Sequence, residues 1–179
     1  MKAEAFAERC RHLRLLLSDV DGVLTDGSVL VLPDGREAKV FHVRDGLGVA
    51  LAQRAGLRVG LISGRSSESV ERRAAELAID LVIQGASDKR AALDALLESQ
   101  GLAASQVAYL GDDLNDLAVM RAVGLSAAPA DAPHEVRQAA FLVTDARGGQ
   151  GCLREVVEAI LRARGEWEAV LATCGLGPA

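Results

Sequence analysis

The chain has 179 residues, about the length of one domain, which is enough to bury a single sizeable core. Its formal net charge of -5 at pH 7 and its 3% content of aromatic residues argue against a nucleic-acid partner, because such surfaces concentrate Lys, Arg and stacking rings. The three cysteines have no metal or redox spacing, which favours a cytoplasmic protein. No apolar run approaches the ~20 residues of a membrane span, so we expect no membrane partner.

Strand and helix patterns alternate along the chain. Residues 3–12 are expected to form a short helix, and the apolar run 13–20 predicts a buried parallel strand because it stops abruptly at acidic residues and glycine. Two apolar stretches, 28–32 and 37–43, are joined through Pro-Asp-Gly, which is typical of a hairpin. We expect further strands at 57–62, 79–83, 107–110, near 125 and at 141–143, and further helices at 45–54, 67–77, 87–99, up to about 123, after 133 and at 153–164.

The hairpin, at about residues 23–43, follows the first strand and would overhang its end as a flap. Several of its apolar residues would be exposed, namely Val29, Leu30, Val31, Leu32, Val40, Phe41 and Val43. Contact with other subunits is the economical way to cover them, because exposed apolar patches and open strand edges favour association. The hairpin therefore predicts oligomerisation.

The spacing of strands and helices implies right-handed crossovers and a parallel sheet with helices on both faces. The predicted fold is three-layer α/β in a single domain, residues 1–179, with no insertion long enough for a cap domain. Residues from about 166 to 179 show no packing pattern and are expected to project as a C-terminal tail.

Polar residues follow four of the predicted strands: Asp19 and Asp21 after the first, then Ser63, Lys89, Asp112, Asp113 and Asp116. Active sites of open α/β sheets lie at the carboxyl ends of the strands, so we expect these side chains to share one site. In an extended chain Asp19 and Asp21 would point the same way about 6–7 Å apart, and such carboxylates repel unless a cation or a shared proton separates them.

Carboxylates, a hydroxyl and a lysine at one edge suit phosphoryl transfer. Carboxylates from two strands would hold Mg²⁺, which prefers one or two carboxylates together with water and substrate phosphate. Ser63 and Lys89 would bind the phosphate oxygens, since a loose transition state needs electrostatic help. Asp19 is the candidate nucleophile, forming an aspartyl phosphate, and Asp21 would protonate the leaving oxygen and then take a proton from water.

These stretches resemble, in order, the four motifs of the haloacid dehalogenase superfamily of phosphatases. They are residues 19–27 (Asp-Val-Asp-Gly-Val-Leu-Thr-Asp-Gly), Ser63, Lys89 and residues 111–116 (Gly-Asp-Asp-Leu-Asn-Asp). The resemblance implies Asp19 as nucleophile, Asp21 as acid/base, and Mg²⁺ bound by Asp19, the backbone carbonyl of Asp21 and Asp112. Asp113 or Asp116 would support the metal, and the choice between them stays open.

Other stretches resemble the capless branch of this superfamily, which has a Rossmann-like sheet and includes the phosphatases of 3-deoxy-D-manno-octulosonate (KDO) 8-phosphate. They include 41–46 (Phe-His-Val-Arg-Asp-Gly), 62–65 (Ile-Ser-Gly-Arg) and 148–151 (Gly-Gly-Gln-Gly). The resemblance implies a Mg²⁺-dependent homotetramer that hydrolyses KDO 8-phosphate for lipopolysaccharide synthesis, with a neighbour's hairpin closing each site. Substrate contacts would come from Arg44, Asp45, Gly46, Gly64 and Arg65.

Two alternatives differ in substrate or in class. Phosphatases of nine-carbon 3-deoxy sugar acid 9-phosphates share nearly every motif, but an acidic residue tends to stand where this chain has Arg65; a guanidinium suits a substrate carboxylate and favours the eight-carbon substrate. A signalling receiver domain also arranges aspartates, a hydroxyl and a lysine around Mg²⁺. Its phosphate acceptor ends the third strand, whereas here Gln84-Gly85 follows that strand without an acid.

Overall fold

The computed structural model describes residues 2–174, so the last part of the expected tail, 175–179, lies outside the described residues. At its centre is a six-stranded sheet in the order β5-β4-β1-β6-β7-β8, in which every neighbouring pair is parallel. The strands are β1 (Leu15–Ser18), β4 (Arg58–Ile62), β5 (Leu81–Ile83), β6 (Val107–Leu110), β7 (Leu125–Ala128) and β8 (Leu142–Val143). β1 therefore lies inside the sheet, between β4 and β6.

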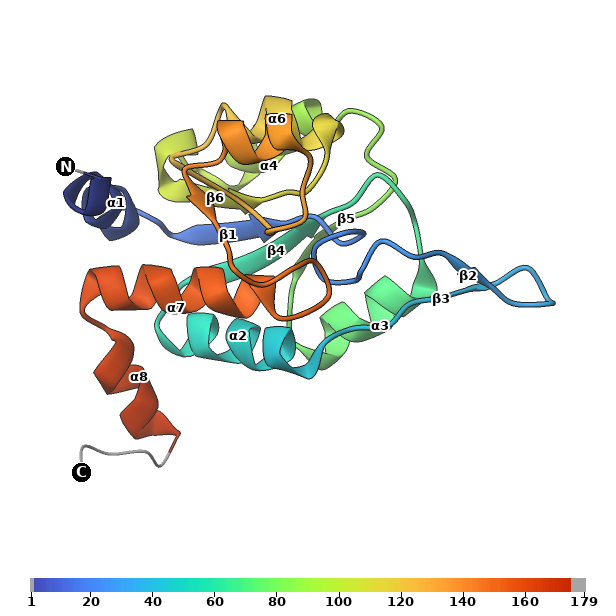
Figure 1. Ribbon diagram of the computed structural model, residues 1–179, viewed down its shortest axis with the longest axis horizontal. Coiled ribbons are helices and arrows are strands. Elements are labelled where there is room, and N and C mark those ends of the chain that lie inside the picture. Colours follow the sequence, from blue (N-terminus) through green and yellow to red (C-terminus); the bar gives the residue numbers. More distant parts are fainter. Residues whose placement is uncertain (1, 175–179) are drawn as a thin grey trace.

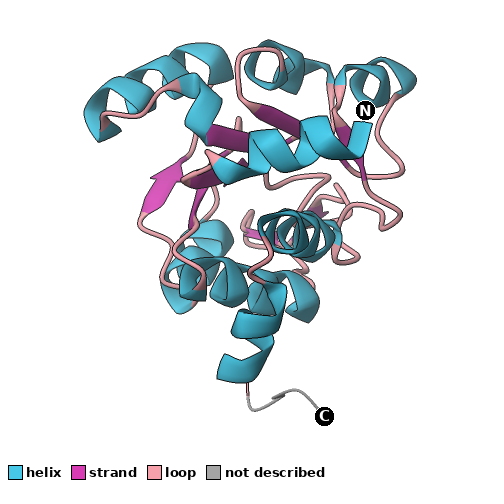
Figure 2. Cartoon of the chain, turned by 90° about the vertical axis from the view of Figure 1, so that its left-hand side faces the viewer, coloured by secondary structure: helices cyan, strands magenta, loops and turns pink. Residues whose placement is uncertain are grey.

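Helices cover both faces of the sheet, so the predicted three-layer α/β fold is confirmed (Figure 1; Figure 2). One layer contains α1 (Lys2–Arg11), α2 (Val43–Arg54), α3 (Glu68–Glu76) and α7 (Cys152–Arg164); the other contains α4 (Lys89–Gln100), α5 (Leu117–Met120) and α6 (His134–Ala139). The 3-10 turns η1 (Ala104–Gln106) and η2 (Leu114–Asp116) precede β6 and α5. No helix among the described residues is long and apolar enough to cross a membrane.

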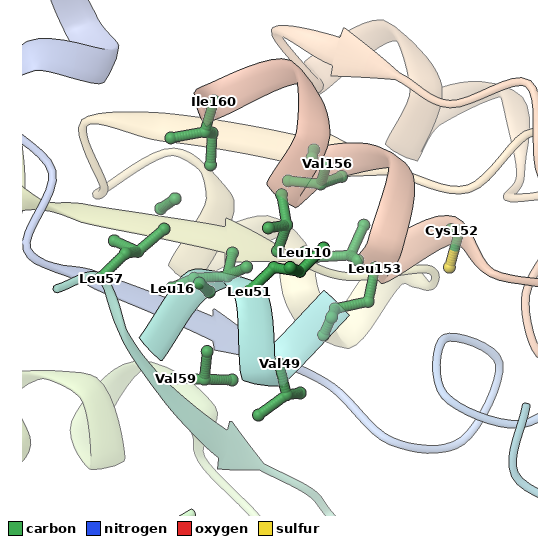
Figure 3. Packing of buried hydrophobic residues seen from close by; sticks show 14 of the residues in the cluster. Leu16, Val49, Leu51, Leu57, Val59, Leu110, Cys152, Leu153, Val156 and Ile160 are labelled. Carbon is green, nitrogen blue, oxygen red and sulfur yellow. The ribbon is translucent and has the colours of Figure 1, made fainter. Parts of the chain in front are cut away.

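The side chains of β1 alternate between the two helical layers, as expected for a strand made of apolar residues. Leu16 belongs to the same buried cluster as Val49 of α2 and Leu153 of α7 (Figure 3), whereas Leu15 and Leu17 pack with the other layer. All three leucines are fully buried. Because both faces of β1 are covered, the strand is held in the middle of the sheet and delivers the next residue to the centre of its carboxyl edge.

The predicted hairpin flap is present and projects from the body of the molecule (Figure 1). It consists of β2 (Leu30–Val31) and β3 (Glu37–Ala38), which pair antiparallel. Both strands are shorter than the apolar stretches 28–32 and 37–43 suggest. Leu30, Val31 and Val40 have exposed fractions of 57%, 62% and 79%, as expected from the sequence. Leu32 and Phe41, which the sequence also predicts to be exposed, are only partly exposed, because Phe41 packs against the buried cluster of α2 and α7.

The C-terminal segment differs from the prediction. A tail without packing is expected there, but α8 (Trp167–Thr173) is a helix, and its Trp167 side chain is buried. Two arginines of α7, Arg154 and Arg162, place their guanidinium groups over the Trp167 ring, 5.6 and 4.5 Å from its centroid. The prediction is wrong because contacts with the preceding helix stabilise a segment too short to show a helical period in the sequence.

Candidate active site

The four polar strand ends meet at one cavity on the carboxyl edge of the sheet, with a volume of about 380 Å³. Its lining consists of Asp19, Asp21, Gly27, Ser63, Gly64, Arg65, Lys89, Asp112, Asp113 and Asn115. The cavity forms because β1, β4 and β6 are adjacent and parallel, so the residues that follow them emerge side by side. Residues separated by up to 96 positions in the sequence thereby share one site.

Asp19 occupies the centre of this edge and is only 5% exposed. Its backbone N–H donates to the Leu110 carbonyl at 2.9 Å, which continues the β1–β6 ladder past the end of the strand. One carboxylate oxygen accepts from the backbone N–H of Val20 at 2.7 Å, and the other lies 2.7 Å from the ammonium of Lys89. Burial first, and then the nearby carboxylate of Asp116, raise the pKa of Asp19 to about 6, against the opposing effect of Lys89.

Lys89 is the first residue of α4, whose N-terminus is capped by the Asp88 side chain accepting from the backbone N–H of Ala91. Its ammonium is buried and lies 2.7 Å from both Asp19 and Asp116. Burial acts to lower the pKa of Lys89, but the two carboxylates outweigh burial and raise it. Lys89 therefore stays protonated, and two of its three N–H donors are directed at carboxylates.

Asp112 and Asp116 are the other carboxylates of the site. Carboxylate oxygens of Asp19, Asp112 and Asp116 lie within 4.8 Å of one another. The Oδ1 atom of Asp112 is buried without a hydrogen-bond partner, and burial, followed by the charges of Asp19 and Asp116, raises its pKa to about 8. Such a cluster of carboxylates, one of them with an unpaired oxygen, could hold a divalent cation.

Asp116 and Asp113 differ in their surroundings. Asp116 is fully buried: Oδ1 accepts from the Tyr109 hydroxyl at 2.6 Å and from Lys89, and Oδ2 accepts from the backbone N–H groups of Asp112 and Asp113. Asp113 is exposed, and its carboxylate accepts from the backbone N–H of Leu114 at 2.7 Å. Asp116 thus fixes the loop that carries Asp112, whereas Asp113 begins the turn η2.

The chain turns directly after Asp19 and does not continue as an extended strand to Asp21. The Val20 carbonyl accepts from the backbone N–H groups of Leu24 and Thr25 at 2.9 and 3.1 Å, which closes the turn. Gly22 has a φ of +88°, and a side chain there would overlap the carboxylate of Asp112. The spacing expected for an extended chain therefore does not apply, although both Asp19 and Asp21 line the cavity.

Asp21 has a partner that sequence reasoning missed. The ammonium of Lys39, from the flap, donates to Oδ1 of Asp21, and the Lys39 side chain is only 2% exposed. The other oxygen of Asp21, Oδ2, is buried without a hydrogen-bond partner. The available signal was a single lysine between Ala38 and Val40, in the hairpin that directly follows the motif of Asp19 and Asp21.

Comparison with known proteins identifies the family. Residues 75–154 match the model of a family of haloacid dehalogenase-like hydrolases. Over 158 residues the chain is 44% identical to the 3-deoxy-D-manno-octulosonate 8-phosphate phosphatase of Escherichia coli K12, covering 88% of this chain and 84% of that protein. The chain belongs to the haloacid dehalogenase-like hydrolases. The corresponding phosphatase of Haemophilus influenzae is 41% identical over 159 residues, with coverage of 89% and 88%.

Solved structures agree with this family assignment. A probable YrbI-family phosphatase from Pseudomonas syringae matches the hydrolase with a TM-score of 0.93 and 44% identity, covering 98% of this chain and 99% of that one. The KDO 8-phosphate phosphatase of Moraxella catarrhalis, solved with magnesium, phosphate and KDO, matches with a TM-score of 0.91 and 39% identity over 94% and 97% of the two chains. The overall fold therefore follows that of phosphatases in this family.

The residues after β4 form one wall of the hydrolase's cavity. Ser63 is buried, and its hydroxyl accepts from the backbone N–H of Arg65 at 3.2 Å, so the hydroxyl is held at the start of the turn. The guanidinium of Arg65 reaches the flap and pairs with Glu37. Arg65 therefore stands at the rim of the cavity, where a substrate carboxylate could replace that of Glu37.

Three residues expected to contact substrate lie elsewhere in this hydrolase. Arg44, Asp45 and Gly46 belong to the first turn of α2 and do not line the cavity. Asp45 is buried and accepts from the backbone N–H of Arg154 at 2.9 Å, at the N-terminus of α7; burial raises its pKa. Within this chain, therefore, Asp45 joins two helices, and a substrate contact from these three residues stays a prediction. Asn115, which does line the cavity, was missed although it lies within a recognised motif.

Proposed function

We propose that this hydrolase is a Mg²⁺-dependent phosphatase that converts KDO 8-phosphate to KDO and inorganic phosphate. One observation carries the proposal: Asp19, Asp21, Ser63, Lys89 and Asp112 line a single cavity. They are the residue types that phosphoryl transfer through an aspartyl phosphate requires. The substrate is that of the curated relatives at 41–44% identity, which share most of the chain's length.

Mg²⁺ would be bound by Asp19, Asp112 and the backbone carbonyl of Asp21. The site fits a hard cation because its carboxylate oxygens are close together and Oδ1 of Asp112 lacks a partner. We assign the supporting role to Asp116 rather than Asp113, because Asp116 is buried and bonded to the loop that carries Asp112. The cation would supply positive charge that offsets the repulsion between carboxylates and the charge of the phosphate.

The side chains would divide the chemistry between them. A carboxylate oxygen of Asp19 would bond to phosphorus as the bond from phosphorus to the sugar oxygen breaks. Asp21 would give its proton to that leaving oxygen and later take one from the water that hydrolyses the aspartyl phosphate. The remaining donor of Lys89 and the hydroxyl of Ser63 would hold phosphate oxygens as their negative charge spreads.

Substrate recognition would come from the rim of the cavity. Arg65 would pair with the carboxylate of the sugar acid, displacing Glu37, because a guanidinium binds a carboxylate in a planar, two-bonded geometry. The backbone at Gly64, which also lines the cavity, would approach the phosphate closely. Arg44, Asp45 and Gly46 complete the proposed substrate contacts only as family-based expectations.

We further propose a homotetramer in which the flap of one subunit closes the site of another. Support comes from the exposed apolar residues Leu30, Val31 and Val40 and from the cavity itself, which no cap domain among the described residues covers. A cytoplasmic location is supported by the three free cysteines Cys10, Cys152 and Cys174. A role in lipopolysaccharide precursor synthesis is proposed only from the resemblance to the KDO 8-phosphate phosphatases.

The proposal is tested with a panel of phosphate esters. Purified protein with Mg²⁺ is given KDO 8-phosphate, a nine-carbon 3-deoxy sugar acid 9-phosphate and simple sugar phosphates, and released phosphate is measured. We expect the highest kcat/KM for KDO 8-phosphate and loss of turnover in EDTA. Equal or faster turnover of the nine-carbon ester would reject the substrate but keep the chemistry. No release from any ester would reject the function.

A further inference from the structure

We propose that Lys39 is a positioning residue that orients the Asp21 carboxylate, so that the seating of the flap controls proton transfer to the leaving group. The inference rests on the proposed function and deepens it. The observation behind it is the ion pair between the flap lysine and Asp21, together with the unequal surroundings of the two Asp21 oxygens.

The two oxygens of Asp21 have different environments. Oδ1 accepts from the ammonium of Lys39, whereas Oδ2 is buried and has no partner among the described residues. A free carboxylate group rotates about its Cβ–Cγ bond over a broad range of angles. With Oδ1 held, rotation is restricted, and Oδ2 is the oxygen left to exchange a proton with the leaving group and with water.

The Lys39–Asp21 contact is built into the fold rather than formed at the surface. The Lys39 side chain is 2% exposed and that of Asp21 is 20% exposed. An ammonium is buried only when a partner compensates for its lost hydration, so Lys39 is committed to Asp21 wherever the flap takes this position. Lys39 lies between Ala38 and Val40 and directly follows Ala38, the last residue of β3.

The same strand is fastened on the opposite wall of the cavity. Glu37 pairs with Arg65, and the Ser69 hydroxyl donates to the Glu37 carbonyl at 3.4 Å. β3 therefore runs from the wall that follows β4 to the loop that follows β1. The Arg65 side chain is 49% exposed, and such a pair contributes little stability. Lys39 is therefore the stronger attachment, and a displaced flap would release Asp21.

The effect on the reaction depends on the leaving group. In the first half-reaction the phosphorus–oxygen bond to the leaving group breaks while Asp19 bonds to phosphorus, and the proton on Oδ2 of Asp21 passes to the departing oxygen. A phenol with a strongly electron-withdrawing substituent departs as the anion and gains little from this proton. A poor leaving group depends on it. If Asp21 is misoriented, kcat/KM should therefore fall more steeply as the leaving group becomes poorer.

The experiment measures kcat/KM with Mg²⁺ for p-nitrophenyl, p-chlorophenyl, phenyl and p-methoxyphenyl phosphate. These esters differ in leaving group but hardly in shape. Because kcat/KM reports only the steps through phenol release, the later attack of water does not enter. For Lys39→Met we expect a loss on the order of 10- to 100-fold with phenyl phosphate, below the full contribution of a general acid, and a loss under about 3-fold with p-nitrophenyl phosphate.

Two further variants separate orientation from a general effect of the flap. Glu37→Gln removes the ion pair with Arg65 but keeps the contact between Lys39 and Asp21, so Asp21 stays oriented and any loss of kcat/KM should be similar for all four esters. Lys39→Arg keeps the positive charge and should recover part of the loss with phenyl phosphate. It also provides the test if Lys39→Met does not fold, because an altered reach should still steepen the leaving-group dependence relative to wild type.

The outcomes are distinguishable. A steeper dependence in the Lys39 variants but not in Glu37→Gln supports the inference. The inference is overturned if folded Lys39→Met or Lys39→Arg has the same leaving-group dependence of kcat/KM as wild type, or loses kcat/KM equally for every ester. The proposed phosphatase function is unaffected by either result. If the wild-type protein hydrolyses none of these esters and not KDO 8-phosphate either, the proposed function falls and this inference falls with it.

Discussion

At the scale of single residues, the main feature of the site is a set of buried charged side chains. Asp19, Lys89 and Asp116 are all buried, and each carboxylate lies 2.7 Å from the shared ammonium. Burial of isolated charges is costly, so such a set persists only when its members pair. The arrangement supports the proposal that Asp19, rather than Asp116, is the nucleophile, since Asp116 already has all its hydrogen bonds within the protein.

Asp19→Asn should therefore abolish turnover, with a loss on the order of 10⁴-fold or more in kcat, because an amide oxygen does not form the acyl phosphate. Lys89 keeps Asp116 as a partner, so the variant should fold. Phosphate release from KDO 8-phosphate is the measurement. Asp94→Asn makes the same chemical change in an exposed pair with Arg90 and serves as the control. Turnover by Asp19→Asn within about 10-fold of that control would reject Asp19 as the nucleophile.

Asp112 gives a prediction about pH in the absence of metal. Its folded pKa of about 8 is above its unfolded value near 4, so between these values the folded state holds a proton that the unfolded chain releases. Its contribution to stability is therefore greatest below about pH 4 and is lost as pH rises towards 8. Asp112→Asn cannot ionise and should escape this loss.

Thermal unfolding in EDTA at pH 5 and pH 8 tests this. The difference in free energy of unfolding between Asp112→Asn and wild type should shift in favour of the variant by roughly 1–3 kcal/mol from pH 5 to pH 8. Each kcal/mol corresponds to ~2–4 °C in Tm. The comparison with wild type cancels the titration of groups far from the site, whereas any change in the titration of Asp19 and Asp116, whose charges act on Asp112, is part of the measured difference. Parallel pH profiles for the two proteins would show that Asp112 is not held protonated by its neighbours.

Residues at strand ends were predictable, and residues brought in by the flap were not. Asp19, Ser63 and Asp112 each follow an apolar strand, and the topology of parallel sheets brings such ends together. Lys39 follows a hairpin that is outside the main sheet, and no rule of strand order says where the residues after that hairpin will reach. Its contact with Asp21 is visible only in three dimensions.

At the scale of elements, the loop after β1 is held by the chain from both sides. On one side Gly22 lies against Asp112; on the other, Gly149 donates to the Val23 carbonyl at 2.8 Å, and the Cys152 thiol donates to the same carbonyl at 3.3 Å. The turn before α7 therefore packs behind the loop after β1 rather than lining the cavity. The sequence shows the glycine-rich stretch 148–151 at this turn, but not the loop that the turn supports.

Gly22→Ala tests whether this close packing sets the cation site. The substitution adds a methyl group at a φ of +88° and against the Asp112 carboxylate, so we expect destabilisation of about 1–3 kcal/mol and a higher Mg²⁺ concentration for half-maximal activity. Gly56→Ala is a matched control, because Gly56 has a φ of +74° and nothing within 4 Å of the added atom.

The control should lower Tm through backbone strain alone and leave the Mg²⁺ dependence unchanged. Thermal unfolding and activity titrated with Mg²⁺ are measured for both variants. The same Mg²⁺ dependence in Gly22→Ala and Gly56→Ala would mean that the approach of Gly22 to Asp112 does not shape the cation site.

At the scale of the whole molecule, the body and the flap differ in how completely they are buried. The body has two apolar clusters, one on each face of the sheet, and this division follows from the alternation of side chains along the strands. The flap has Leu30, Val31 and Val40 on its surface, and its strands β2 and β3 contribute to neither cluster. The sequence predicts this exposure, but one chain alone does not contain the surface that would cover it.

Light scattering should therefore give four times the protomer mass of 18.7 kDa at micromolar concentration. In a closed symmetric assembly a substitution is repeated in every subunit, so Val31→Lys should dissociate the tetramer. Val143→Lys makes the same change at a 40% exposed residue of the edge strand β8, outside the flap, and should stay assembled. A wild-type monomer at this concentration would remove the idea that a neighbour closes the site.

The dissociated variant also tests whether the flap of a neighbouring subunit closes the cavity. If a neighbouring flap closes the cavity over the sugar acid, Val31→Lys should lose about 10-fold or more in kcat/KM for KDO 8-phosphate, equivalent to at least about 1.4 kcal/mol of binding to the transition state. The small ester p-nitrophenyl phosphate does not reach that cap, so its hydrolysis should change far less. Equal losses for both esters would indicate that dissociation disturbs the groups around the phosphate, such as Asp19 and Lys89, because hydrolysis of p-nitrophenyl phosphate depends little on the proton from Asp21.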